Sequence, residues 1–205
     1  MTFPTPNPSS SSNSRPCSIP RTFRIGQPSD AASFSNLLKE VFTKTFSHDL
    51  PNEDLQEYLS NTLSNQQIER EIRDDDSIWI LAVSVPVSIR SSTQKEEDEI
   101  LLGVIQLRLK SIKDCLTLTS SPIELHRIYL STQTHGKGLS QSILHHAEEI
   151  SRARGYSSIW LEVYSKHPQG IKFYEKSGFR KCGERIFKVG DEEQVDWVME
   201  KSLIE

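Results

Sequence analysis

The segment from Ile123 to Ile150 constrains the fold more than any other part of the chain. Its first eight residues have the composition of a strand, but the alternation of apolar residues changes phase: Ile123 and Leu125 are at odd positions, whereas Ile128 and Leu130 are at even ones. A one-residue bulge would explain this change and would leave backbone N–H and C=O groups outside the ladder. A strand buried on both faces needs no strict alternation and explains the pattern equally well.

A loop with two glycines follows this strand and leads into a helix. The loop reads Gln133-Thr134-His135-Gly136-Lys137-Gly138, and the helix after it carries apolar residues at Leu139, Ile143, Leu144, Ala147 and Ile150. Such glycines let successive amides point into one concavity at a helix N-terminus, where a phosphate or pyrophosphate is favoured. A purely structural turn before a helix would use the same residues. The third glycine of the dinucleotide fingerprint and the Lys-Ser/Thr of the Walker pattern are both absent.

The periodicity of the rest of the chain predicts an α/β protein with a mixed sheet. Helices are expected after Asp30, after Pro51 and from Asn65, and then over residues 138–154 and 168–176. Strands are expected near Phe23 and Ile25 and over 78–85, 100–109, 123–130, 158–163, 179–187 and 195–203. The polar segment 91–99 is expected to be an exposed loop, and no linker divides the chain after residue 22.

The N-terminal residues 1–21 are predicted to be a disordered tail, and residues 22–205 to be a single domain. Residues 1–20 hold five of the ten prolines and six serines, and they contain few residues that a core could bury. Because the first acidic residue is Asp30, an organelle transit peptide is the alternative interpretation of the tail.

Charge and hydropathy exclude several classes of function. The chain has 24 basic and 28 acidic residues, a formal net charge of −4 and no Lys/Arg cluster, so no nucleic-acid partner is expected. The negative net charge would suit a cationic substrate. No apolar stretch is long enough to span a membrane, and no membrane partner is expected. The three cysteines lack CxxC spacing, which favours a reducing, cytoplasmic location and no metal site.

Two motifs together resemble those of the GNAT superfamily of N-acetyltransferases. Gln133-x-x-Gly136-x-Gly138 after a bulged strand is similar to the superfamily's pyrophosphate-binding motif, and Tyr174-x-x-x-Gly178-Phe179 is similar to its second hallmark. The resemblance implies the GNAT fold: a mixed, mostly antiparallel sheet of six to seven strands, with a bulged and splayed fourth strand and flanking helices. It also implies acetyl-CoA as co-substrate and a small-molecule amine as acceptor. A homodimer is compatible with it.

Within the superfamily the chain resembles most the bacterial PaiA-type spermidine/spermine N-acetyltransferases. This similarity lies in the segments 46–72, 123–129 and 190–194. It favours a polyamine acceptor. A peptide or protein amine as acceptor, or a non-catalytic acyl-CoA-binding module, are the alternatives.

The resemblance also implies roles for individual residues. Tyr174 would be the general acid, although a core aromatic would explain it too, and Glu124 the general base, with His126 and Glu162 in reserve. His167 stands where the family has an asparagine, so either His167 or Gln169 would replace its hydrogen bond. Other expected cofactor contacts are Ile128, Tyr129, Leu130, Gln133, Thr134, His135, Gly136, Lys137, Gly138, Leu139, Ser140 and Lys176. Carboxylates near the first helices would hold a cationic acceptor, unless they form an ordinary solvated face: Glu40, Asp49, Glu53, Asp54 and Glu57.

Overall fold

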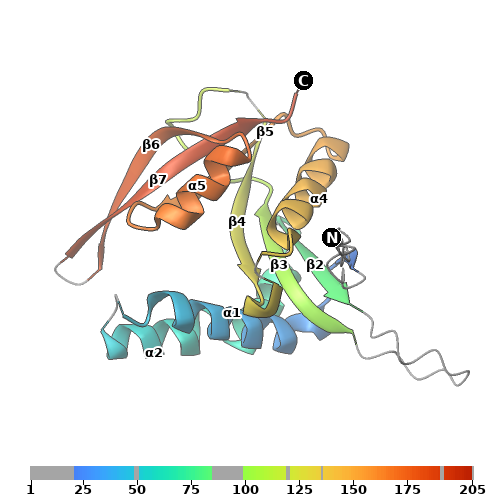
Figure 1. The fold of residues 1–205 in the computed structure, drawn as a ribbon, viewed down its shortest axis with the longest axis vertical. Coiled ribbons are helices and arrows are strands. Elements are labelled where there is room, and N and C mark those ends of the chain that lie inside the picture. The colour runs from blue at the N-terminus through green and yellow to red at the C-terminus, as the bar shows by residue number, and fades with distance from the viewer. Residues whose placement is uncertain are drawn as a thin grey trace, which may run out of the picture.

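A single seven-stranded sheet organises the protein (Figure 1). The computed structural model describes residues 21–48, 51–84, 99–118, 121–134, 136–189 and 192–204. The strand order is β1-β2-β3-β4-β5-β7-β6, and only β4 and β5 pair in parallel. This confirms the expected mixed, mostly antiparallel sheet. The strands are β1 (Thr22–Ile25), β2 (Ser77–Ser84), β3 (Ile100–Arg108), β4 (Pro122–Leu130), β5 (Ser158–Tyr164), β6 (Arg180–Val189) and β7 (Glu192–Ser202).

Five α-helices cover the two faces of the sheet (Figure 1). They are α1 (Ala31–Phe46), α2 (Asn52–Asn61), α3 (Asn65–Ile72), α4 (Leu139–Ala153) and α5 (Pro168–Lys176), with single 3-10 turns at Pro28–Asp30 and Thr132–Thr134. No described helix is long and apolar enough to cross a membrane. The predicted helices and strands are confirmed to within a few residues. The predicted tail, apart from Arg21, and the polar loop, apart from Glu99, lie outside the described residues.

The two faces carry separate apolar clusters. Strand β2 contributes to both, because successive side chains of a strand point to opposite faces. Its Trp79 and Leu81 pack against α1 and α3, while Ile80 belongs to the cluster that also contains Ile143 and Ala147 of α4. Both faces of the central strands are therefore covered.

Strand β4 carries a bulge, which was one of the two explanations for its change of apolar phase and which the resemblance also implied. Gln106 of β3 pairs with Arg127 and the next residue, Leu107, pairs with Leu125, so His126 is the extra residue. The other explanation also holds in part, because β4 is buried at each position from Pro122 to Leu125.

Beside the bulge, β4 and β5 separate. Their parallel pairing covers only Pro122↔Ser158, Ile123↔Ile159 and Glu124↔Trp160. Beyond Glu124 the backbone groups of β4 that face β5 have no strand partner. The expected splayed strand is thus confirmed, and the functional site opens at this point.

Candidate active site

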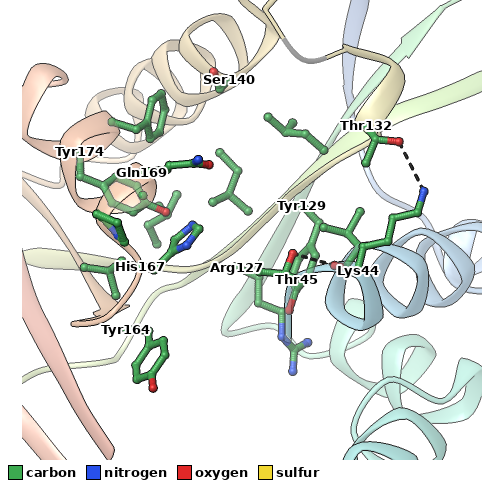
Figure 2. A pocket seen from close by; sticks show the side chains of 18 of the residues that line it. Lys44, Thr45, Arg127, Tyr129, Thr132, Ser140, Tyr164, His167, Gln169 and Tyr174 are labelled. Carbon is green, nitrogen blue, oxygen red and sulfur yellow. Dashed lines mark hydrogen bonds between the residues drawn. The ribbon is translucent and has the colours of Figure 1, made fainter. Parts of the chain in front are cut away.

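A cavity of about 980 Å³ lies where β4 and β5 diverge (Figure 2). Its walls come from segments far apart in the sequence: α1, β4, the loop before α4, the end of β5, and α5. A volume of this size is typical of a ligand pocket that holds a cofactor-sized molecule.

The loop before α4 forms one end of the cavity. Gly136 and Gly138 line it with backbone φ angles of +72° and +73°, and a Cβ added at either position would meet no atom within 4 Å. Thr134 and Ser140 line the same end. Because the first N–H groups of α4 lack intrahelical partners, this end is an open cradle of donors at a helix N-terminus. The residues present therefore fit a pyrophosphate.

Three residues beyond the bulge form the floor. Ile128, Tyr129 and Leu130 of β4 line the cavity at the stretch where pairing with β5 has ended. An extended ligand with amide groups can pair with such a strand edge through the backbone. The expected contacts for a pantetheine arm are thus present in the cavity.

Tyr174 of α5 points its hydroxyl into the cavity (Figure 2). Its ring lies edge-on to Phe173 and Phe179, with centroids 5.2 and 5.6 Å away. Burial raises the pKa of the hydroxyl above its ordinary value, so it stays protonated at neutral pH. The ring of Tyr174 packs in the core while its hydroxyl faces the cavity, so the placement is compatible with both roles considered from the sequence.

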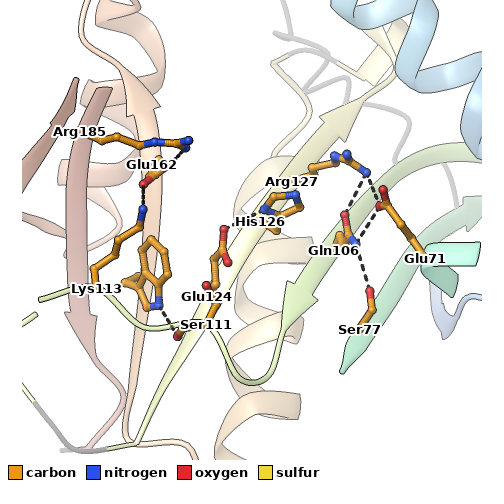
Figure 3. Close-up of polar contacts among 11 residues, drawn as sticks. Glu71, Ser77, Gln106, Ser111, Lys113, Glu124, His126, Arg127, Glu162 and Arg185 are labelled. Atoms are coloured by element: carbon orange, nitrogen blue, oxygen red, sulfur yellow. Dashed lines mark hydrogen bonds and ion pairs between the residues drawn. The ribbon is translucent and has the colours of Figure 1, made fainter. Parts of the chain in front are cut away.

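The three candidate bases, whose polar contacts are drawn in Figure 3, differ in their access to the cavity. His126 and Glu162 line it, whereas Glu124 is buried beside it and binds Nδ1 of His126 through Oε1 at 2.7 Å. Arg185 donates a hydrogen bond of 2.8 Å to Oε2 of Glu162. The Lys113 ammonium lies 2.7 Å from Oε1, as an ion pair outside hydrogen-bond geometry.

The wall contributed by α1 differs from the sequence expectation. Val41, Lys44 and Thr45 of α1 line the cavity, together with His48 in the turn that follows the helix and Tyr58 of α2. The expected carboxylates that the structure describes are not part of the cavity lining. Glu40 pairs with Lys44 at 2.6 Å on the exposed side, and the carboxylates of α2 are exposed to solvent: Glu53, Asp54 and Glu57. Asp49 lies outside the described residues. The described carboxylates therefore form an ordinary solvated face, which was the alternative to a role in holding a cationic acceptor.

Several other expected contacts are also placed by the structure. His167 and Gln169 both line the cavity, so either can take the place of the family's asparagine. The described lining omits Gln133, Lys137 and Lys176, and Leu139, the first residue of α4, packs in the core instead. His135 lies outside the described residues.

Sequence reasoning missed a buried polar network behind the bulge. Arg127 Nη1 donates to Glu71 Oε2 at 2.6 Å and to Gln106 Oε1 at 3.1 Å, and Gln106 donates to Glu71 and to Ser77 (Figure 3). The guanidinium lies 6.0 Å from the centre of the Trp79 ring. Arg127 and Glu71 are 56 residues apart in the sequence, so no local pattern could have paired them.

Comparison with known proteins agrees with this geometry. Residues 38–179 match the model of the acetyltransferase (GNAT) family. An uncharacterized N-acetyltransferase from the pepI 3' region of Lactobacillus delbrueckii subsp. lactis is 25% identical over 175 residues, which is 85% of this chain and 93% of that protein. A spermidine N(1)-acetyltransferase of Thermoplasma acidophilum is 31% identical over 104 residues, 51% of this chain and 54% of that protein.

Among solved structures, the fold is similar to that of the PaiA N-acetyltransferase from Thermoplasma acidophilum, which was determined in complex with coenzyme A. The TM-score is 0.66 at 20% identity, with 89% of this chain and 99% of that chain covered. The family match spans most of the protein and includes both the glycine loop and Tyr174. The chain therefore belongs to the GNAT family of acetyltransferases, and it is an acetyl-CoA-dependent N-acetyltransferase.

Proposed function

We propose that this enzyme acetylates a primary amine of a small molecule by direct attack within a ternary complex, and that the acceptor is a polyamine. The observation that carries the direct-attack mechanism is one continuous cavity, which joins the glycine cradle to Tyr174 and His126. The polyamine assignment is supported by the Thermoplasma relative, which is named a spermidine N(1)-acetyltransferase.

In this proposal, bound acetyl-CoA supplies the acetyl thioester. The amides around Gly136 and Gly138 hold its pyrophosphate, and the free edge of β4 orients its amide-containing arm. A backbone N–H of this edge polarises the thioester carbonyl. Tyr174 donates a proton to the leaving sulfur, and a base near the bulge removes one from the acceptor amine.

The charge of the cavity favours a second candidate acceptor, a peptide or protein amine. Among the described lining residues, Glu162 is the one carboxylate and is already paired with two cations. Lys44, Arg127 and Lys166 are cationic, and the first two are paired with Glu40 and Glu71, which lie outside the lining. The described lining therefore offers a polycation no carboxylate other than the paired Glu162, while Lys166 can attract an acceptor that carries a carboxylate near its amine.

A single assay separates the two acceptors. Release of free CoA thiol from acetyl-CoA is measured with a panel of spermidine, spermine, amino acids, aminoglycosides and short peptides. We expect the highest kcat/KM with a polyamine. A preference for peptides by tenfold or more would replace the polyamine proposal with the peptide one, and thiol release that no amine stimulates would refute amine acetylation.

We further propose a cytoplasmic location. Cys115 and Cys182 are both free thiols, as expected in a reducing compartment.

A further inference from the structure

Glu124 and His126 form a hydrogen-bonded pair at the bulge of β4. Nδ1 of His126 lies 2.7 Å from Oε1 of Glu124. The side chain of His126 is 26% exposed and lines the cavity, whereas that of Glu124 is 11% exposed and does not reach the described lining. Of these two side chains, only the imidazole of His126 therefore has direct access to an acceptor amine.

Glu124 is held as a carboxylate. Burial opposes its ionisation, but hydrogen bonds from His126 and from the Ser111 hydroxyl outweigh this and lower the pKa of the carboxyl. A carboxylate with a lowered pKa is a weak proton acceptor for an ammonium group. It is well suited to accept a hydrogen bond from Nδ1–H of an imidazole and so to fix the tautomer and the orientation of the ring.

Glu162 is less suited to the role of base. Both of its oxygens face cations, Lys113 at 2.7 Å and Arg185 at 2.8 Å. An acceptor amine would therefore have to displace one of these two cations to reach a carboxylate oxygen of Glu162.

We propose that His126 is the catalytic base and that Glu124 is its positioning residue. This inference deepens the proposed function and rests on it. With Nδ1–H donating to Glu124, the lone pair of Nε2 is left free to accept a proton in the cavity. As the N–C bond forms and the C–S bond breaks, the acceptor ammonium loses two protons. One passes to Nε2 of His126 and then to solvent. The other replaces the proton that Tyr174 gives to the departing sulfur.

The test compares two amide substitutions, His126→Gln and Glu124→Gln, in the full chain with the best acceptor of the panel. We expect His126→Gln to lower kcat by about 10²–10⁴-fold, the usual contribution of a general base. Glu124→Gln keeps an oxygen that can accept from Nδ1–H, so we expect a smaller loss, of about 10-fold to 100-fold. The KM for acetyl-CoA should not change in either variant.

Two further measurements separate proton transfer from a purely structural role. The kcat/KM of the wild type should rise with pH, because only a neutral imidazole can accept a proton, and this limb of the pH profile should be lost in His126→Gln. The same limb should persist in His48→Gln, which changes another histidine of the described lining. Added imidazole should restore part of the activity of His126→Ala.

The charged groups that surround the pair are the same in all these variants. They are Arg108 on β3, Lys113 in the loop that follows, Arg127 on β4, Glu162 on β5 and Arg185 on β6. A matched control is His145→Gln, because His145 lies 3.5 Å from a glutamate, Glu149, on the exposed side of α4 and away from the cavity. This control should retain wild-type kinetics.

Each remaining outcome has a distinct meaning. If Glu124→Gln loses more activity than His126→Gln, Glu124 itself is the base and the proposal is wrong. It is equally wrong if His126→Gln retains both its activity and the pH limb. If the wild type shows no amine-dependent thiol release, the proposed function fails first and the base proposal fails with it.

Discussion

Gly136 offers a direct test of the phosphate cradle, through the paired substitutions Gly136→Asp and Gly136→Asn. The backbone φ there is +72°, and a Cβ would meet no atom within 4 Å. Asn and Asp are the non-glycine residues that best tolerate this left-handed conformation. Both variants should therefore fold, with nearly the same free energy of unfolding, and they differ essentially in one negative charge.

The size of the effect follows from Coulomb's law. A carboxylate about 5 Å from a phosphate charge, at an effective dielectric constant of about 20, is repelled by about 3 kcal/mol. This corresponds to a loss of more than about 100-fold in affinity. We expect the Kd for CoA to be at least about 100-fold weaker for Gly136→Asp than for Gly136→Asn, with thermal unfolding midpoints within about 4 °C.

Isothermal titration calorimetry with CoA measures the difference, and pantetheine, which lacks the pyrophosphate, is the control ligand. Its affinity should be equal in the two variants. The difference for CoA should shrink as salt is added, because the cradle is exposed to solvent. Equal CoA affinity of the Asp and Asn variants at low salt would show that the loop is only a turn before α4.

Three other perturbations test separate parts of the site. Gly138→Ala and Gly155→Ala both place a methyl group at positive φ in open space, so each variant should lose about 1–2 kcal/mol of stability. Calorimetry should show weaker CoA binding only for Gly138→Ala, because Gly138 lines the cavity. Tyr174→Phe should lower kcat while the Kd for CoA stays the same; an unchanged kcat would leave the ring with a packing role alone. Arg127→Leu removes the cationic partner of buried Glu71 and should therefore lower the free energy of unfolding, measured with urea, by about 3–5 kcal/mol. A loss below about 1 kcal/mol would contradict the burial argument.

The course of β4 shows how far the sequence could predict the site. The change of apolar phase located the bulge, because the side-chain period of a strand is two and any insertion shifts it. It did not reveal which of Glu124 and His126 would reach the cavity. That depends on where the extra residue falls and on Ser111, which comes from the loop before β4 and hydrogen-bonds Glu124.

The first helices show a second limit of what could be predicted from the sequence. The periodicity of α1 correctly predicted its buried face, through Phe34 and Leu38. Which polar residues reach the cavity also depends on their position along the helix axis. Glu40 and Lys44 lie one turn apart on the same side of α1 and form an ion pair, yet of the two only Lys44 is in the described lining. A pattern that locates the core therefore does not decide which charges line an adjoining cavity.

The buried network explains how the bulge can be accurate enough for catalysis. A bulge interrupts the ladder, so backbone hydrogen bonds alone hold this part of β4 less firmly. Here side chains hold both sides of it. Arg127 is anchored to Glu71 on α3 and to Gln106 on β3, while Glu124 joins His126 to Ser111 on the other side. Positioning within about 0.5 Å is what proton transfer requires, and neighbouring hydrogen bonds of this kind supply it. The contacts that the sequence could not predict, Arg127 with Glu71 and Glu124 with Ser111, therefore hold the chain on both sides of His126.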